Sequence, residues 1–269
     1  MLEIFSYGFM VRALVAGIAV GVVAPLIGTF LVAKRYSLIA DSLAHVSLAG
    51  VAAVVLLGLN PILGALAVAA VGAFAIEKLR AGKHVTGEVA LAMFLSSGLA
   101  VAVVLIGLNT RVNIDLMSFL FGSITTVSAQ DVWIICGLAT LIIGAVGVLY
   151  RQLAYTSFDE EQAQASGLRV HLLNQALILL AAATVVLSLR IVGGLLIGAL
   201  TVIPVAAAAQ VARSFRQTMF FAVGFGLLAV IAGLLASFYL DLAAGGTIVL
   251  TALILFLLAL LFQKVVPRR

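Results

Sequence analysis

Residues 35–59 read RYSLIADSLAHVSLAGVAAVVLLGL, an apolar stretch that contains an aspartate and a histidine four residues apart. Such a stretch is long enough to cross the ~30 Å hydrocarbon core of a bilayer as one helix. Four residues make just over one helical turn, so Asp41 and His45 project from the same face. A carboxylate at membrane depth costs free energy and indicates a functional site. A carboxylate and an imidazole on one face are also suitable ligands for a first-row divalent metal ion.

The composition of the whole chain is that of an integral membrane protein. Of the 269 residues, 65% are hydrophobic and only 9% are charged, and the mean hydropathy is +1.32. Soluble domains carry about a quarter charged residues, so a soluble protein is excluded. The single cysteine, Cys136, excludes a disulfide framework and a multi-thiolate metal site. The first apolar run is too long for the hydrophobic region of a cleavable signal peptide.

Apolar runs of about 20 residues predict nine transmembrane helices in a single domain of residues 1–269. They lie near 9–32, 38–58, 61–79, 88–108, 132–150, 171–189, 191–212, 217–240 and 245–263. The sixth and seventh runs are nearly contiguous around Arg190 to Gly194, so they form either a tight re-entrant hairpin or a broken helix. The predicted fold class is therefore an all-α polytopic membrane protein with about nine spans, within a range of eight to ten.

The basic residues predict the orientation of these spans. With the N-terminus outside and the C-terminus cytoplasmic, twelve of the fifteen lysines and arginines fall in cytoplasmic segments. The positive-inside rule favours this orientation. Segment 109–131 then lies outside and is too apolar for a simple loop, which predicts an interfacial or re-entrant helix. Segment 156–168 lies inside and predicts a short polar helix, with Ser157 or Asp159 as its N-cap and Gly167 just after its end.

A structural role is the alternative for the intramembrane pair, with hydrogen bonds to Ser37, Ser42 or Ser47 and to neighbouring helices. We favour metal ligation or proton relay, because no basic residue in the same span neutralises Asp41. Two side chains do not complete a coordination shell. We therefore expect further oxygen ligands from the backbone, from water or from another helix.

Other ionisable residues have simpler explanations. His84 and Glu88 are four residues apart, but they lie where a basic loop meets the first turn of a helix, so a solvated helix start is favoured over a metal site. Three aspartates on the outer side form either an acidic entrance for cations or ordinary solvated loops: Asp115, Asp131 and Asp241. The chain contains no GxxxxGK[ST], HExxH or GxSxG motif, so we expect neither ATP hydrolysis nor another enzymatic activity.

Several segments, in order along the chain, resemble the permease subunits of bacterial zinc, manganese and iron ABC importers, the ABC-3 group. These segments are RYSLIADSLAHVSLAG, DLMSFLFGSITTVSAQD, FDEEQAQASGLRV, GGLLIGALTVIPVAAAAQVA and DLAAGGTIVLTAL. The resemblance runs nearly from end to end, and five motifs in order are far more specific than hydropathy.

The resemblance implies roles for two groups of residues. Asp41 and His45 match the positions at which such permeases bind the ion in transit. The loop that begins at Phe158 matches the cytoplasmic coupling helix, which docks in a groove of the ATPase. The residues carried over for ATPase coupling are Phe158, Asp159, Glu160, Glu161 and Gly167. Glu160 stands where family members often have proline, a change that should preserve helix initiation.

The resemblance also implies partners and cargo. The partners are two ATP-binding subunits, a second permease copy that forms a homodimer, an extracytoplasmic metal-binding protein and the surrounding membrane lipid; no nucleic acid is expected. We expect no permanently bound cofactor. The transported divalent cation is expected to be Zn²⁺, with Mn²⁺ or iron as the other candidates, because zinc systems are common in this family and the binding protein usually sets selectivity.

The expected function is therefore divalent metal import across a bacterial plasma membrane by alternating access, driven by a separate ATPase subunit. One alternative is a permease for metal chelates such as siderophores or cobalamin, which needs no bare ion ligands. Another is a proton-coupled carrier without an ATPase partner, which co-purification with a nucleotide-binding subunit would exclude.

Overall fold

The computed structural model describes residues 6–82, 85–108 and 116–265, and within these ranges it contains helices and turns but no strand. The helices, in chain order, are α1 (Gly8–Ala33), α2 (Ile39–Leu56), α3 (Pro61–Ala81), α4 (Gly87–Gly107), α5 (Leu116–Phe121), α6 (Ala129–Phe158), α7 (Glu160–Ala165), α8 (Val170–Ser188), α9 (Ile197–Val211), α10 (Phe215–Leu240) and α11 (Ala244–Val265). The all-α polytopic fold predicted from the sequence is confirmed.

Eight of the described helices are long and apolar enough to cross a membrane, and α9 is a shorter apolar helix. Each of the nine predicted spans corresponds to one of these helices. Polar residues at the ends of the apolar runs start several of them. Asn60 caps α3 ahead of Pro61, and Ser128 and Asp131 form a capping box at the start of α6.

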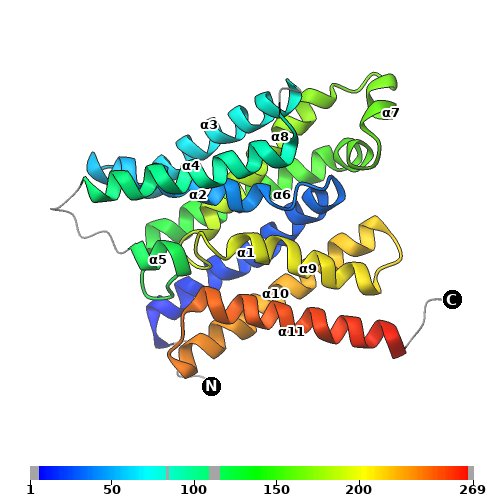
Figure 1. Ribbon diagram of the computed structural model, residues 1–269. Helices are drawn as coiled ribbons and strands as arrows, with labels where there is room; N and C mark the ends of the chain where they lie inside the picture. Colours follow the sequence, from blue (N-terminus) through cyan, green and yellow to red (C-terminus); the bar gives the residue numbers. More distant parts are fainter. Residues whose placement is uncertain (1–5, 83–84, 109–115, 266–269) are drawn as a thin grey trace.

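The predicted span 191–212 differs most from the structure, because its first six residues are not helical. Helix α8 ends at Ser188 and α9 begins at Ile197 and runs back antiparallel to α8, so the chain forms a hairpin here rather than a broken helix (Figure 1). Ile191 and Val192 are fully buried in the intervening turn. The 15 residues of α9 rise about 22 Å, less than the ~30 Å of a hydrocarbon core. The N-terminus of α9 therefore lies within the bundle (Figure 1).

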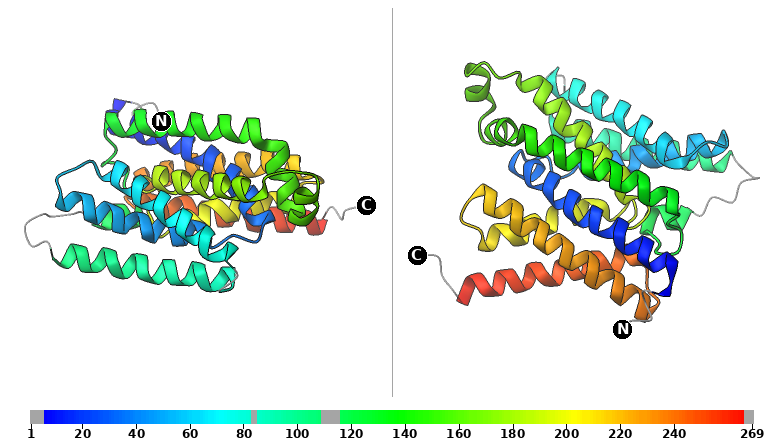
Figure 2. Two further views of the ribbon diagram at one scale, coloured as in Figure 1. Left: turned by 90° about the horizontal axis from the view of Figure 1, so that it is seen from above. Right: turned by 180° about the vertical axis from the view of Figure 1, so that it is seen from behind.

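The helices pack around α1, which contacts α6, α8, α9 and α10, while α2 packs between α3 and α4 (Figures 1 and 2). Helix α1 begins at one end of the bundle and α11 finishes at the other (Figure 1). The end at which α1 finishes carries Lys34, Arg151, Arg169 and Arg216, and we call it the basic end. The opposite end, with α5 and the turn between α10 and α11, is called the far end.

Candidate functional site

Asp41 lies in the first turn of α2, because a turn at residues 34–38 separates α1 from α2. Its half-buried carboxylate interacts with the backbone N–H of Gly198, in the first turn of α9. The first N–H groups of a helix have no partner within the helix and carry partial positive charge. Two helix N-termini therefore stabilise the negative charge of Asp41 inside the bundle.

Position 198 accepts only glycine while the carboxylate stays where it is. A Cβ added to Gly198 would overlap Asp41 Oδ1. The turn before α9 is thus what brings a backbone N–H against the carboxylate. Sequence reasoning missed Gly198 as a site residue, although the motif GGLLIGALTVIP that contains it contributed to the family resemblance.

His45 lies one turn further along α2, and its Nδ1 is 3.0 Å from the backbone oxygen of Leu95 in α4. A carbonyl oxygen can only accept a hydrogen bond, so Nδ1 carries the proton and the lone pair of Nε2 remains available. Helix α4 comes this close because it has Gly98, whose Cβ position would lie 2.8 Å from the backbone nitrogen of Val46. A backbone carbonyl that fixes the tautomer is a usual partner of metal-ligating histidines.

Two of the three serines considered as structural partners of the pair, Ser42 and Ser47, bond to backbone carbonyls instead. Ser42 Oγ donates to the oxygens of Leu38 and Leu91, at 3.1 and 2.9 Å, and Ser47 Oγ donates to that of Leu43 at 2.6 Å. Among the described residues, no group of three or more His, Cys, Asp or Glu side chains surrounds a common point. One chain therefore offers an oxygen and a nitrogen ligand, but not a full coordination shell.

Three backbone hydrogen bonds join the segment around α5 to the turn that precedes α9. They run from Gly194 N to Phe119 O at 2.7 Å, from Leu195 N to Leu120 O at 3.1 Å and from Ser123 N to Arg190 O at 3.1 Å. Gly193 has φ +87° and packs against the backbone of Leu120 and Gly122, a conformation and a spacing that favour glycine. This backbone ladder closes the bundle at the far end, directly before the helix start that faces Asp41.

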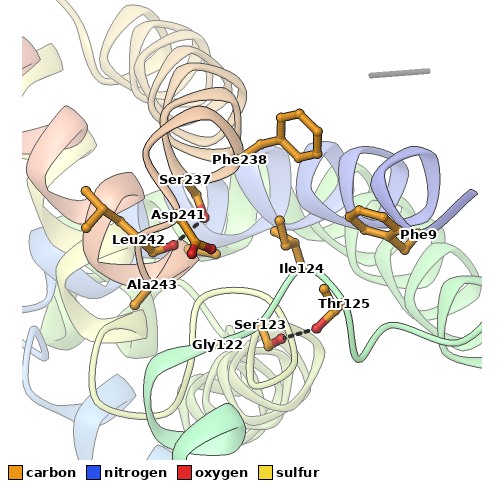
Figure 3. A pocket seen from close by; sticks show the side chains of 11 residues that line it. Phe9, Gly122, Ser123, Ile124, Thr125, Ser237, Phe238, Asp241, Leu242 and Ala243 are labelled. Carbon is orange, nitrogen blue, oxygen red and sulfur yellow. Dashed lines mark hydrogen bonds between the residues drawn. The ribbon is translucent and has the colours of Figure 1, made fainter. Parts of the chain in front are cut away.

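A cavity of about 440 Å³ adjoins the ladder at the far end. It is lined by residues 122–125, by the turn between α10 and α11 and by Phe9 (Figure 3). Asp241 contributes a carboxylate, and the hydroxyls of Ser123 and Thr125 lie 3.0 Å apart. The cavity is a polar opening on the side that we expect to face outside.

The other aspartates considered for an acidic entrance do not join Asp241 there. Asp131 is buried in its capping box with Ser128, and it lies 3.8 Å from the guanidinium of Arg190. Asp115 lies outside the described residues. The described aspartates therefore form no acidic cluster at the far end.

Helix α7 lies at the basic end, beyond the end of α6 (Figure 1). The carboxylate of Asp159 accepts from the N–H of Gln162 and caps the helix, whereas Ser157 bonds back to Leu153. Gly167 has φ +84° and turns the chain towards α8. Of the two N-caps considered, the structure has Asp159.

Lys34 ties α7 to three membrane-spanning helices. Its ammonium group, at the end of α1, donates to Thr156 O of α6 at 2.9 Å and to Asn174 Oδ1 of α8 at 2.8 Å. It also donates to Glu160 Oε1 of α7 at 2.6 Å. Because the Lys34 side chain is only 2% exposed, this cluster holds α7 against the bundle. In the sequence, Lys34 is only one of the twelve basic residues that predict the orientation.

The charges in this cluster alter each other's titration. Burial alone would raise the pKa of Glu160, but the hydrogen bond and the positive charge of Lys34 outweigh it and leave the pKa lowered. Burial lowers the pKa of Lys34, and Glu160 opposes that effect in part. Each charge of the pair therefore favours the ionised form of the other.

The five residues to which the family resemblance assigns a role in ATPase coupling have different surroundings. Phe158 is 70% exposed at the end of α6, with one ring contact to Phe215. Glu161 is also exposed, on α7. By contrast, Asp159 caps the helix, Glu160 binds Lys34 and Gly167 forms the turn. Of these five residues, Phe158 and Glu161 are the two whose side chains are exposed and form no hydrogen bond or ion pair with a described residue.

Comparisons with known proteins find relatives over nearly the whole chain. The family model described as "ABC 3 transport family" matches residues 6–263. The chain is 34% identical over 254 residues to the manganese import system permease protein ScaB of Streptococcus parasanguinis. The aligned region covers 94% of this chain and 90% of that protein. The chain is 32% identical over 259 residues to the manganese transport system membrane protein MntC of Listeria innocua, covering 96% and 92% of the two chains.

Solved structures share the fold. PsaBC from Streptococcus pneumoniae, in complex with Fab, superposes with a TM-score of 0.87 at 32% identity and covers 98% of this chain and 97% of that one. An inward-facing structure assigned to the metal-chelate type of ABC transporter has a TM-score of 0.69 at 20% identity, covering 96% and 85%. At that identity the second likeness concerns the fold alone.

Proposed function

Because the chain belongs to the ABC 3 transport family, we propose that it is the multi-pass plasma-membrane permease through which an ATP-binding-cassette importer moves a divalent metal ion. The observation that carries this proposal is the environment of Asp41 and His45. One carboxylate and one imidazole with a free Nε2 share a face of α2 inside an apolar bundle. A hard oxygen and a borderline nitrogen ligand are suitable for Mn²⁺, Fe²⁺ and Zn²⁺.

In this proposal the ion reaches Asp41 and His45 from the far end and leaves at the basic end. The carboxylate matters more than the number of ligands, since an unaccompanied dication in a low-dielectric site is costly. An incomplete shell of protein ligands favours release over storage. The missing ligands come from water, from backbone oxygens or from a second copy of the chain across a twofold axis.

Manganese is the first ion to test and zinc the second. The sequence favoured zinc only on the frequency of zinc systems, and one Asp with one His does not choose between the two ions. The relatives ScaB and MntC are named for manganese import and transport. Because selectivity is also set by the binding protein that delivers the ion, both ions need to be measured with the complete importer.

Two ATP-binding subunits would dock at the basic end of a permease dimer, and a metal-binding protein would dock at the far end. Phe158 and Glu161 are the exposed side chains next to α7 that such an ATPase would contact. Lys34 would pass movement of α7 to α1, α6 and α8 through its hydrogen bonds. Movement of these helices would open the site to the two sides in turn.

The test is Asp41→Asn in the complete importer, which keeps the shape of the side chain and removes its charge. Uptake of radiolabelled Mn²⁺ or Zn²⁺ should be lost, with unchanged amounts of the complex in the membrane. Glu88→Gln, an exposed carboxylate in the first turn of α4, is the matched control and should import normally. Normal import by Asp41→Asn, or uptake of a metal chelate but not of the bare ion, would contradict the proposal.

A further inference from the structure

A groove runs along α1 between α6 and α10 on the face of the bundle seen in the right view of Figure 2. Helix α1 forms its floor, and the other two helices, which lie on either side of α1, form its walls. Its volume is about 530 Å³, and most of its lining is apolar. The apolar lining residues are Val22, Leu26, Ile143, Val146, Gly147, Tyr150, Met219, Phe220 and Val223.

Each wall of the groove ends in an arginine, and both arginines are at the basic end. Arg151 belongs to α6 and Arg216 to the first turn of α10. Both side chains are exposed, and neither forms an ion pair with a described residue. No acidic residue lines the groove. Arg216 lies over the ring of Phe220, 5.7 Å from its centroid, so its N–H groups remain available for an anion.

The groove is separate from the candidate metal site. Helix α9, which supplies Gly198, lies on the face of the bundle seen in Figure 1, with α1 behind it. A molecule in the groove would therefore contact neither Asp41 nor His45. It would instead connect α10 and α6 to α1, and Lys34 is at the end of α1.

We propose that this groove binds one phospholipid with an anionic headgroup, whose phosphate lies between Arg151 and Arg216 and whose acyl chain follows α1. The charges are complementary, because two unpaired cations face a site with no carboxylate. The wall also offers length for an acyl chain, since the nine residues from Ile143 to Arg151 span about 12 Å along the apolar part of α6. Basic pockets between transmembrane helices on the cytoplasmic side are typical anionic-lipid sites. A zwitterionic lipid would gain the apolar contacts but not the two net charges.

Substitutions in this chain can distinguish the contribution of headgroup contacts to lipid binding from that of acyl-chain contacts. Arg151→Gln and Arg216→Gln each remove one cation, and Arg213→Gln removes an exposed cation at the same end that does not line the groove. Gly147→Leu places a larger side chain in the groove, at a position where nothing lies within 4 Å of the added Cβ. Gly144→Leu, equally unobstructed on the same helix and outside the groove, is its control.

The experiment measures lipid retained by the full chain, purified in detergent and incubated with phosphatidylglycerol or with phosphatidylethanolamine of the same acyl chains, by native mass spectrometry. The wild type should retain phosphatidylglycerol preferentially. Each groove arginine variant should bind it roughly fivefold more weakly, which corresponds to about 1 kcal/mol per arginine. Gly147→Leu should abolish retention, and both control variants should behave as the wild type.

Three results would overturn the proposal. The first is equal retention of both lipids by the wild type, which would exclude recognition of the anionic headgroup. The second is unchanged phosphatidylglycerol retention in Gly147→Leu and in the double arginine variant. The third is a Gly147→Leu variant that changes the oligomeric state in lipid-free detergent while lipid retention stays the same, since the groove would then be a protein interface.

Discussion

Gly198→Ala is the substitution that tests most directly how the structure holds Asp41. The added methyl group would overlap Asp41 Oδ1, so the carboxylate has to move by roughly 1 Å to reach normal van der Waals contact. Movement on that scale removes its interaction with the N–H of residue 198. A hydrogen bond to a charged group contributes about 1.5–3 kcal/mol. If the ion binds the carboxylate only in its present position, the affinity should fall roughly 10- to 150-fold.

The assay is the concentration dependence of Mn²⁺ uptake by the complete importer, with the amount of complex in the membrane measured in parallel. Gly144→Ala is the control, because its Cβ position is unobstructed on another helix and alanine there only improves helix propensity. The half-saturating concentration should rise for Gly198→Ala and stay constant for Gly144→Ala. A Gly198→Ala importer that assembles normally and transports within twofold of the wild type would refute the reasoning.

Three further predictions concern the ends of the bundle. Lys34→Met should lower metal-stimulated ATPase activity of the complete importer roughly 5- to 30-fold, since about 1–2 kcal/mol of hydrogen bonding to α6 and α7 is lost. Lys78→Met, which changes an exposed lysine, should leave this activity unchanged. The pKa of Glu160 is lowered in the folded protein, so its pair with Lys34 stabilises the fold at pH values above the unfolded pKa of about 4.3, and this stabilisation is lost as the pH falls through the lowered pKa. The difference in melting temperature between the wild type and Glu160→Gln should therefore be present at neutral pH and vanish in acid. A difference that stays constant with pH would contradict this. Gly193→Ala, at φ +87°, should weaken the backbone hydrogen bonds between the α5 segment and the turn before α9 by about 1–2 kcal/mol. In a background without Cys136, a Ser123→Cys side chain should then be labelled more by an impermeant thiol reagent. Unchanged labelling would mean that these hydrogen bonds do not close the far end.

Hydropathy predicted the number and positions of the membrane-crossing helices well, because a bilayer requires apolar runs of nearly fixed length. It failed at residues 191–196, where a buried turn is as apolar as a helix. Ile191 and Val192 have no exposed surface, and nothing in their side chains distinguishes the two conformations. Only the glycines at 193 and 194 indicated a break.

The site was predictable to the extent that it lies on one helix. The helical period alone places Asp41 and His45 on a common face of α2. Gly198 and the carbonyl of Leu95 come from α9 and α4, distant in sequence, and no local pattern relates them to α2. The same holds at the basic end, where the sequence predicted a short capped helix, but only the fold shows that Glu160 turns inward to Lys34.

The turn before α9 has a mechanical consequence. Only one residue separates Leu195, which is held by a carbonyl of α5, from the first residue of α9, whose N-terminus faces Asp41. Because the connection is so short, a displacement of the α5 segment must also displace the N–H dipoles that face the carboxylate of Asp41. Opening the far end and changing the electric field at Asp41 are then a single movement. In the proposed importer, movement of this one segment would change both access from the far end and the affinity for the ion, and neither could change alone.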